Sequence, residues 1–435
     1  MSNKVKIAII GAGMRGLHFY GQPLIKNRDI AQVVAVAEPN EHFRSAAASM
    51  HNITAQNTFT GWEQLLDRPR LADAVIIATP DALHKGPAIT AANQGYHILL
   101  EKPMASSARD CFEIAQAVTK NKVLFAVCHV LRYAPYYNFI KTLLDNGSIG
   151  KICTIEHLEG VGWWHQAHSF VRGNWRNSKE SSFMLLAKSC HDMDILHWWI
   201  DRRCLNISSF GHLKHFRKEC KPVGSAERCM DCGLSDGQCA YSAKQFYYNK
   251  LKLKDFGWPL SCLVHEFTES ALEQALRTGP YGRCVYHCDN DVVDHQVVAM
   301  EFEDQITAAF TMTAFAPCGR KTRIMGSAGY LEGNETSVRV LDFKTGHWTE
   351  YDIPYMFSSS SGNHGGGDTG LIEAFLNAVK NNDAQYIKTG PEQTLHSHLL
   401  AFAAETSRVE KRTVNISEFE QSLHLPTQTV TISGI

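Results

Sequence analysis

A glycine-rich turn near the amino terminus limits the fold of this chain more than any other feature. The apolar run Lys4 to Ile10 leads into Gly11-Ala12-Gly13-Met14-Arg15-Gly16, and a helical pattern follows. This G-x-G-x-x-G spacing between a strand and a helix is typical of a dinucleotide-binding Rossmann turn. A second apolar run, 33–37, ends in Glu38, where such folds place the carboxylate that binds the adenosine ribose. The sequence therefore predicts a dinucleotide site.

The acid after the second strand bears on which dinucleotide binds. A 2′-phosphate would meet the charge of Glu38, so the sequence favours NAD over NADP. Arg44 lies close in sequence, and a guanidinium that reached over Glu38 would make NADP tolerable. We therefore expect NAD and leave NADP tolerance open.

The length of 435 residues predicts two domains, because it exceeds the usual size of one hydrophobic core. Residues 1–130 alternate short strand-like runs with helical segments, which indicates a Rossmann domain with a parallel sheet. Residues 131–435 carry strand-like runs without helices of crossover length between them, which predicts a mainly antiparallel sheet in an α+β domain. Within this part we expect helices over 183–200, 369–380 and 391–410, and an insertion over about 212–282.

Composition and charge exclude several classes of protein. The 43 Lys and Arg residues against 44 Asp and Glu give no reason to expect nucleic acid or an anionic membrane as a partner. No apolar run approaches the roughly 20 residues that span a bilayer, and no signal peptide precedes the first strand, which predicts a cytoplasmic protein. The 13 cysteines are odd in number and scattered, which argues for reduced thiols rather than a disulfide framework.

Polar residues follow the predicted strands at their carboxyl ends, where ligands of a parallel sheet collect. They are Thr79-Pro80, Glu101-Lys102-Pro103 and His129. Lys102 is the strongest catalytic candidate. Hydride leaves a carbinol carbon only as the hydroxyl proton departs, so a base or a polarising cation must lie within hydrogen-bond reach of that oxygen.

These motifs together resemble the Gfo/Idh/MocA oxidoreductase family over essentially the whole chain. The resemblance rests on the glycine turn, Glu38, Thr79-Pro80, Glu101-Lys102-Pro103, the segment 129–135, Gly147-Ser148-Ile149-Gly150-Lys151 and Cys190-His191-Asp192-Met193-Asp194. It implies that the second domain is an open sheet with helices on one face, which binds a sugar or cyclitol and mediates oligomerisation. Most members are dehydrogenases of such polyols, and a minority are NAD-dependent glycosidases that oxidise the sugar transiently.

The resemblance also assigns roles to residues. It implies cofactor-binding roles for Gly11, Ala12, Gly13, Met14, Arg15, Gly16, Glu38, Thr79, Pro80, His84, Glu101, Lys102 and His129, and catalytic roles for Lys102 and His191. Many relatives carry Asp-x-x-x-His on the helix of His191, but here the Asp position is Ala187. Lys188 follows immediately and is predicted to assist catalysis. Helical spacing predicts that Lys188 and Asp192 pair.

Further polar and aromatic residues are candidates for substrate binding, because short acids and imidazoles grip hydroxyls and aromatic rings stack on sugars. They are Tyr133, Trp163, Trp175, Asp192, Asp294, His295 and His364. A His-Gly-Gly loop like the one at His364 occurs in the glycosidase branch. For any one of the aromatic residues, burial in a core or an interface is an alternative.

Four cysteines of the predicted insertion form a candidate metal site. Cys229 and Cys232 have C-x-x-C spacing, and Cys220 and Cys239 lie nearby, which suits a structural tetrahedral zinc. His215 or Cys262 could replace Cys220. Buried reduced thiols and iron–sulfur ligation are the alternatives.

The sequence thus predicts an NAD-dependent oxidoreductase that transfers hydride from a secondary hydroxyl of a sugar, glycoside or cyclitol. An NAD-dependent glycosidase and a non-catalytic sensor with the same fold are the alternatives. A homo-oligomer, either a dimer or a tetramer, is expected through the open face of the second sheet, because an uncovered apolar face would otherwise remain exposed to water.

Overall fold

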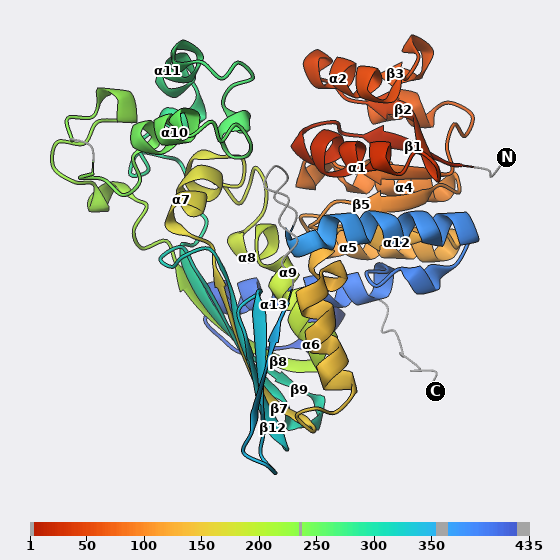
Figure 1. Cartoon of the computed structure of the whole chain (residues 1–435), viewed down its shortest axis with the longest axis vertical. Coiled ribbons are helices and arrows are strands. Elements are labelled where there is room, and N and C mark those ends of the chain that lie inside the picture. Colours follow the sequence, from red (N-terminus) through yellow and green to blue (C-terminus); the bar gives the residue numbers. More distant parts are fainter. Residues whose placement is uncertain (1–3, 235–236, 354–363, 424–435) are drawn as a thin grey trace.

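Two β-sheets organise the chain, and helices from both halves lie between them (Figure 1). The computed structural model describes residues 4–234, 237–353 and 364–423. The insertion forms a third group of helices and loops at one end of the second sheet, and the ring of its His265 lies 4.7 Å from that of His42 in the first unit (Figure 1).

The first sheet has six strands, all parallel. Their order across the sheet is β3 (Thr58–Phe59), β2 (Ala31–Ala37), β1 (Val5–Ile10), β4 (Ala74–Ile77), β5 (His97–Leu100) and β6 (Phe125–Val127). Every residue of β4 and β6 is buried, as expected for strands covered on both faces. The predicted Rossmann architecture is confirmed.

The second sheet has nine strands and is mainly antiparallel, with one parallel pair, β7 and β10. The order is β14 (Trp348–Asp352), β13 (Ser337–Asp342), β12 (Gly329–Gly333), β11 (Gly319–Gly326), β7 (Ile152–Gly160), β10 (Thr307–Thr313), β9 (His295–Phe302), β8 (Cys204–His212) and β15 (Val414–Asn415). Burial alternates strictly along β9, so only one face is covered. The fold class predicted from the sequence is confirmed.

The α-helices have the following bounds: α1 (Gln22–Lys26), α2 (Glu41–His51), α3 (Trp62–Leu66), α4 (Lys85–Asn93), α5 (Ala108–Asn121), α6 (Pro135–Asp145), α7 (Trp163–His165), α8 (Met184–Ala187), α9 (Cys190–Ile200), α10 (Ala243–Lys252), α11 (Glu269–Thr278), α12 (Gly367–Asn381), α13 (Pro391–Glu410) and α14 (Ile416–Ser422). The predicted helix over 391–410 is confirmed by α13. Two segments wind as π-helices, Met14–Gly21 and Gln166–Arg172.

The helix predicted over 183–200 is wrong as one continuous element. The chain forms α8, leaves the helix at Lys188 and Ser189, and resumes as α9. Ser189 has φ −98° and ψ 13°, outside the helical region. Apolar residues continue through this stretch, so hydropathy alone did not reveal the break.

The insertion between β8 and β9 has a small hydrophobic core of its own. Buried side chains of α10 and α11, including Tyr247 and Leu272, pack with Leu260 and Val264. The insertion therefore folds around apolar side chains of its own.

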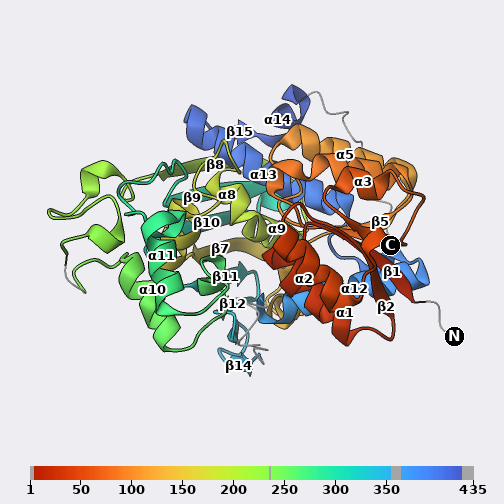
Figure 2. The same ribbon diagram turned by 90° about the horizontal axis from the view of Figure 1, so that it is seen from above.

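The last long helix returns to the first sheet. Leu395 and Leu399 of α13 are part of the core that also contains the strands and helices of the first sheet. The amide of Val127 at the end of β6 donates to the carbonyl of Thr389 at 3.0 Å. Figure 2 shows α13 beside α5, so the chain's carboxyl-terminal part completes the amino-terminal unit.

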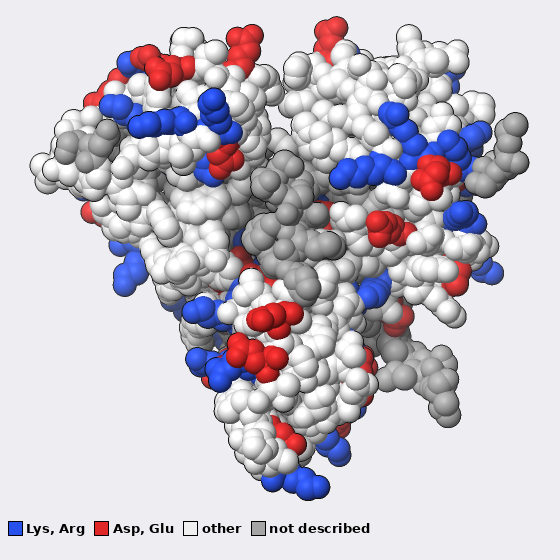
Figure 3. Space-filling view, viewed as in Figure 1, with Lys and Arg blue, Asp and Glu red and all other residues white. Residues whose placement is uncertain are grey.

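Charges of both signs are interspersed on the face shown in Figure 3, without a large area of one sign. Within the described ranges, no helix combines the length and apolar character needed to cross a membrane.

Candidate active site

The glycine turn leaves space where a pyrophosphate would lie. Gly11 has φ +87°, and a Cβ there would stand 2.6 Å from the carbonyl oxygen of Ala78. A Cβ at Gly16 would stand 1.9 Å from the carbonyl oxygen of Gly11, whereas one at Gly13 would meet nothing within 4 Å. Gly11 therefore fits a tight turn, and Gly16 fits close packing of the helix on the strand. Gly13 leaves space for a phosphate to approach the backbone. The helical segment Met14–Gly21 begins at this space, so its first amides can bind phosphate oxygens.

Glu38 is held at the end of β2 by two main-chain amides. Ala12 N donates to Oε2 at 2.8 Å, and Asn40 N donates to Oε1 at 2.9 Å. Glu38 is only 8% exposed, so its carboxylate is fixed, and each oxygen keeps a lone pair for a ribose hydroxyl. Arg44 donates to the main-chain carbonyls of Glu38 and Pro39 at 2.7 and 3.0 Å, so its guanidinium is turned to the backbone.

The end of β4 contributes a buried hydroxyl to the same site. Thr79 Oγ1 has no hydrogen-bond partner among the described residues. Pro80 caps the short helix Asp81–Leu83, which leads to His84. The ring of the fully buried His84 lies between two main-chain carbonyls, with Nε2 2.9 Å from that of Thr79 and Nδ1 2.8 Å from that of Pro103. His84 therefore ties the ends of β4 and β5 together, and its nitrogens are engaged by the chain.

Arg15 and Glu101 form an ion pair in a buried polar network. Arg15 also donates to Tyr20 Oη at 2.7 Å and to Asp368 Oδ1 at 2.8 Å, and Tyr20 donates to Glu101. Burial acts to raise the pKa of Glu101, but the charge of Arg15 and the Tyr20 hydrogen bond hold it below its usual value. The two residues predicted to bind cofactor thus balance each other's charge and join β5 to α12.

Lys102 lies just beyond β5, and its Nζ donates to the main-chain carbonyl of Ala187 at 2.6 Å. Ala187 is the last residue of α8, where carbonyls are available to side chains. No carboxylate lies within ion-pair distance of Lys102 in the described part of the chain. Many members of the family that the sequence resembles carry an Asp at this position. Here the main-chain carbonyl of Ala187 makes the contact with Lys102.

Three imidazoles gather near Lys102. The ring centroid of His191 lies 5.6 Å from that of His129 and 5.8 Å from that of His364. Burial, followed by the charge of Lys102, lowers the pKa of His191 well below its usual value, so the ring is neutral at pH 7. Nδ1 of His191 and both nitrogens of His129 are buried without a partner among the described residues. Buried nitrogens of this kind usually have a hydrogen-bond partner, which a water molecule or a ligand atom would supply here.

His364 lies on the loop before α12 and is paired with an acid. Its Nδ1 is 2.7 Å from Oδ2 of Asp368, and the His364 side chain is 35% exposed against 3% for Asp368. Burial acts to raise the pKa of Asp368, but Arg15 and His364 hold it below its usual value. An ionised acid that orients a partly exposed imidazole makes a group able to donate or accept a proton.

Lys188 pairs with Glu159 at 3.0 Å, so the predicted pairing with Asp192 is wrong. Lys188 lies in the break between α8 and α9, which removes the helical spacing assumed for the pair. Asp192 is fully buried and accepts from Arg320 Nε at 2.6 Å, and its Oδ1 lies 3.0 Å from His157 Nε2. It holds α9 against β7 and β11. The Asp192 carboxylate is therefore engaged by the chain, and its role in substrate binding stays a prediction.

Helix α7 carries Trp163, which the sequence predicts to bind substrate, and His165. Trp163 is 44% exposed. The pKa of His165 is lowered by burial and then by the charges of Lys188, His168 and Lys102, so His165 lies in the same electrostatic environment as the catalytic candidates. Trp175 is half-buried and packs on Phe170, with ring centroids 6.2 Å apart.

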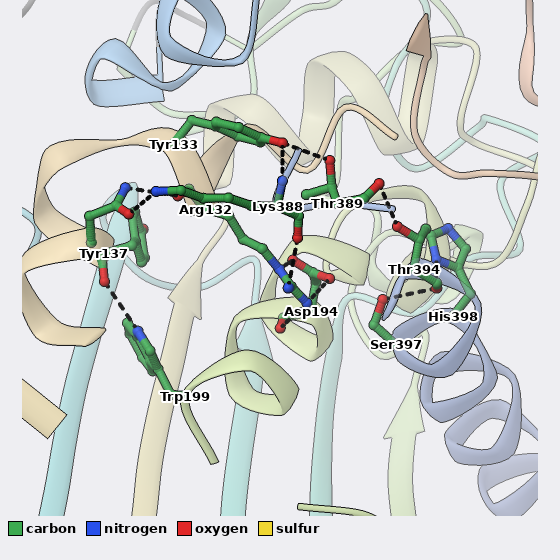
Figure 4. Close-up of polar contacts among 11 residues, drawn as sticks. Arg132, Tyr133, Tyr137, Asp194, Trp199, Lys388, Thr389, Thr394, Ser397 and His398 are labelled. Carbon is green, nitrogen blue, oxygen red and sulfur yellow. Dashed lines mark hydrogen bonds and ion pairs between the residues drawn. The ribbon is translucent and has the colours of Figure 1, made fainter. Parts of the chain in front are cut away.

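A buried ion pair beside the site was not predicted from the sequence. Arg132 donates from Nε to Oδ2 of Asp194 at 2.7 Å and from a second nitrogen to Oδ1 at 2.8 Å, and both side chains are at most 3% exposed (Figure 4). Tyr133 Oη accepts from the amide of Lys388 at 2.8 Å and lies 3.2 Å from Thr389 Oγ1. This network joins the segment after β6 to α9 and to the loop before α13. The hydroxyl of Tyr133, a predicted substrate ligand, is therefore engaged in it.

Asp294 is fully buried at the start of β9. It accepts from the amides of Lys214 and His215 at 2.9 and 2.7 Å, and Nδ1 of His295 lies 2.8 Å from its other oxygen. Asp294 therefore holds the chain that follows β8, and its role in substrate binding stays a prediction, although none of its surface is exposed. The side chain of His295 is 36% exposed.

The predicted zinc site is not supported. Across the described ranges, no three His, Cys, Asp or Glu side chains lie close enough together to hold one metal ion. Cys229, Cys232 and Cys239 line a cavity of about 40 Å³. Cys220 lies outside that lining and donates to the carbonyl of Lys214 at 3.4 Å.

Comparisons with known proteins agree with this geometry. Residues 5–129 match the model of the Gfo/Idh/MocA oxidoreductase family described as an NAD-binding Rossmann fold. Residues 141–416 match the model of the same family described as a C-terminal alpha/beta domain.

Curated relatives include YteT of Bacillus subtilis, described as an oxidoreductase, which is 24% identical over 365 residues, 80% of this chain and 82% of YteT. The 2,7-anhydro-N-acetylneuraminate hydratase of Mediterraneibacter gnavus is 31% identical over 45% of this chain and 49% of its own length. An inositol 2-dehydrogenase of Corynebacterium glutamicum is 28% identical over 48% of this chain and 57% of its own. The chain thus matches about half the length of the last two.

Solved structures show the same fold over nearly the whole chain. The scyllo-inositol dehydrogenase of Lactobacillus casei aligns with a TM-score of 0.64 at 18% identity, covering 96% of this chain and 99% of its own. An oxidoreductase domain protein of Kribbella flavida aligns with a TM-score of 0.69 at 17% identity, covering 96% and 100%. The two family models together span most of the described residues, and the chain therefore belongs to the Gfo/Idh/MocA family of NAD-binding oxidoreductases.

Proposed function

We propose that this protein transfers hydride between NAD and a secondary hydroxyl of a sugar, glycoside or cyclitol. The observation that carries the proposal is the convergence of the Lys102 ammonium and the neutral His191 ring near the carboxyl end of β5, beside the glycine turn. One group can polarise a hydroxyl oxygen while the other takes its proton.

The residues of the first sheet fit NAD. The open space at Gly13 and the unpartnered hydroxyl of Thr79 suit a pyrophosphate and its neighbouring groups. Glu38 would accept the ribose hydroxyls and would repel a 2′-phosphate, and Arg44 is turned to the backbone, so we propose NAD rather than NADP. When bound, NAD would accept the hydride from the carbinol carbon.

Side chains of this protein would carry out the proton transfer from the substrate hydroxyl. His191 is neutral because burial and Lys102 lower its pKa, so it can accept the hydroxyl proton. Lys102 would stabilise the oxygen as negative charge develops. Lys188 would assist with a charge that Glu159 balances at 3.0 Å.

The substrate class rests on the groups around this point and on the relatives. Trp163 offers an exposed ring for stacking, and His364 and His295 offer partly exposed imidazoles for hydroxyls. The inositol dehydrogenases among the relatives support a polyol substrate.

A redox-neutral glycosidase is a second candidate, favoured by the His364–Asp368 pair. Transient oxidation and elimination require proton transfer at the oxidised hydroxyl, loss of the proton on the carbon next to the resulting ketone, and a second transfer that protonates the departing aglycone oxygen. The oriented, partly exposed ring of His364 is available for that second transfer. A relative named as a hydratase of an anhydro sugar is also consistent with chemistry beyond simple dehydrogenation.

The deciding experiment mixes the protein with NAD and a panel of aryl glycosides, free sugars and inositols, and follows nicotinamide reduction and aglycone release in the same wells. Reduced cofactor accumulating in proportion to product supports the dehydrogenase. Aglycone release at a constant cofactor redox state supports the glycosidase, and His364→Asn should then abolish release while sparing oxidation. No turnover of any compound, despite measurable ligand binding, would overturn both and favour a sensor.

We also propose a homo-oligomer through the open face of the second sheet. This face is mixed in character: Phe210 and Val297 are 64% and 44% exposed, and Glu156 pairs with Arg323 at 3.3 Å. Light scattering on the purified protein would test this, since a monomer that persists at high concentration would contradict it.

A further inference from the structure

The cavity in the insertion is lined by four thiols from two separate stretches of chain. Cys229, Cys232 and Cys239 come from the loops before α10, and Cys284 comes from the loop after α11. A short antiparallel bridge pairs Arg228 with Arg283, so Cys284 lies opposite Glu227 and diagonally across from Cys229, on the same side of the pair. The amide of Cys284 also donates to the carbonyl of Glu227 at 2.8 Å. Main-chain hydrogen bonds therefore hold together the two stretches of chain that carry these thiols.

The spacing of the thiols does not suit one metal ion. A tetrahedral zinc with Zn–S bonds of about 2.3 Å requires sulfur atoms about 3.8 Å apart. In the described part of the chain no three such ligands meet this condition. The four thiols nevertheless line one cavity of about 40 Å³, and a cluster needs only one or two of them at each iron.

Arg172 supplies an independent indication that an anion belongs in this cavity. Its side chain lines the cavity and is only 3% exposed. It donates to the carbonyls of Arg283 and Tyr241, each at 2.7 Å, and to Cys229 Sγ at 3.6 Å. No carboxylate pairs with it among the described residues. A buried guanidinium without a counter-charge is costly, and thiolates bound to a metal centre would provide that charge.

We propose that Cys229, Cys232, Cys239 and Cys284 hold an iron–sulfur cluster next to Arg172. Three cysteines in one run and a fourth remote in sequence is an arrangement that iron–sulfur proteins use, and four thiolates are the usual ligand set for such clusters. Cys284 replaces Cys220 in the set of four cysteines predicted from the sequence. This inference does not depend on the proposed reaction.

The cluster would also order the wall of the active site. The π-helix Gln166–Arg172 runs directly on from α7, which carries Trp163 and His165. One end of this continuous segment therefore lies at the cysteine cavity and the other at the catalytic candidates. Loss of the cluster should loosen His165 and raise KM for substrate more than it changes NAD affinity.

The test is anaerobic purification of the whole protein, followed by assays of iron and acid-labile sulfide and by visible absorption and EPR spectra of the reduced sample. We expect equal amounts of iron and sulfide, about two or four of each per chain, and a visible band that dithionite bleaches. Zinc without iron and sulfide would overturn the proposal. So would folded protein without metal that fails to take up iron and sulfide on anaerobic reconstitution.

Two variants test the ligand set. Cys284→Ser should lose at least four fifths of the iron and sulfide, whereas Cys220→Ser should keep them, because Cys284 lines the cavity and Cys220 does not. The reverse result would overturn the assignment. If Cys284→Ser does not fold, Cys232→Ser, which alters a partly exposed position, replaces it with the same expected loss.

Discussion

Lys102 and Ala187 are joined by a hydrogen bond of 2.6 Å between the lysine ammonium and a main-chain carbonyl. The contact fixes the direction of the ammonium without an acidic partner. It depends on the break between α8 and α9, because the last residue of α8 presents its carbonyl at that end of the helix. The backbone thus positions the residue that we expect to act on the substrate oxygen.

Replacing Lys102 with Met should leave NAD binding within about twofold and lower kcat by roughly three orders of magnitude or more, because the cation that stabilises the oxygen is lost. Steady-state kinetics and a cofactor-binding titration measure the two effects. Lys344→Met, on an exposed turn, is the matched control and should behave like the wild type. Turnover near the wild-type rate in Lys102→Met would refute the catalytic role.

Replacing Glu38 with Ser should weaken NAD binding by about 10- to 100-fold, since hydrogen bonds to a charged group contribute about 1.5–3 kcal/mol. The affinity for NADP should fall less or rise, because the charge that repels a 2′-phosphate is gone. Calorimetric titration of both cofactors gives the ratio. Glu41→Ser changes an exposed acid in the first turn of α2 and should leave the ratio unaltered. An unchanged ratio in Glu38→Ser would mean that this carboxylate does not face the ribose.

Replacing Asp194 with Asn should destabilise the fold by about 3–5 kcal/mol, because the buried guanidinium of Arg132 loses its counter-charge. Urea unfolding followed by fluorescence measures the loss. Asp145→Asn breaks the exposed pair with Lys141 and should cost less than about 1 kcal/mol. If both variants lost the same free energy of unfolding, burial of the Arg132–Asp194 pair would not explain its contribution to stability.

Stability should fall as the pH drops below about 6.5. Burial lowers the pKa of His129 to about 4 and that of His398 to about 3, whereas both have ordinary values in the unfolded chain. Between these values and about pH 6.5 the unfolded chain binds protons that the folded chain does not. Each group then removes about 1.4 kcal/mol per pH unit from the free energy of unfolding.

Urea unfolding between neutral pH and about pH 5 would reveal this slope. His398→Gln should reduce it, and His347→Gln, which changes an exposed ring, should not. A slope that stays the same in His398→Gln would show that this histidine is not buried in its neutral form.

The first sheet could be predicted almost entirely from the sequence, because its strands are short apolar runs separated by helices. The second sheet was predicted less completely. The strands β12 and β13 alternate buried and half-buried residues and could have been found by their period of two. No residue of β14 is buried, so its pairing with β13 left no apolar signal.

The candidate site was predictable where one motif carries the chemistry, as for Gly13, Glu38 and Lys102. It was not predictable where distant segments meet. Arg132 pairs with Asp194 across 62 positions, and Arg15 pairs with Asp368 across 353. Such partners share no local spacing, so the sequence predicts Asp192 and Asp294 as substrate ligands without revealing that both are buried and accept hydrogen bonds from distant parts of the chain.

The return of α13 to the first sheet sets the order in which the protein can fold during its synthesis. Thr389 pairs with the end strand β6, and Leu395 and Leu399 complete the core around it. A ribosome that adds about 5–20 residues per second needs on the order of 15–50 s to pass from residue 130 to this helix. During that time the nascent nucleotide-binding unit carries an uncovered strand edge and an apolar helix face. Chains released early, within the insertion, would keep that surface exposed and become substrates for chaperones and proteases.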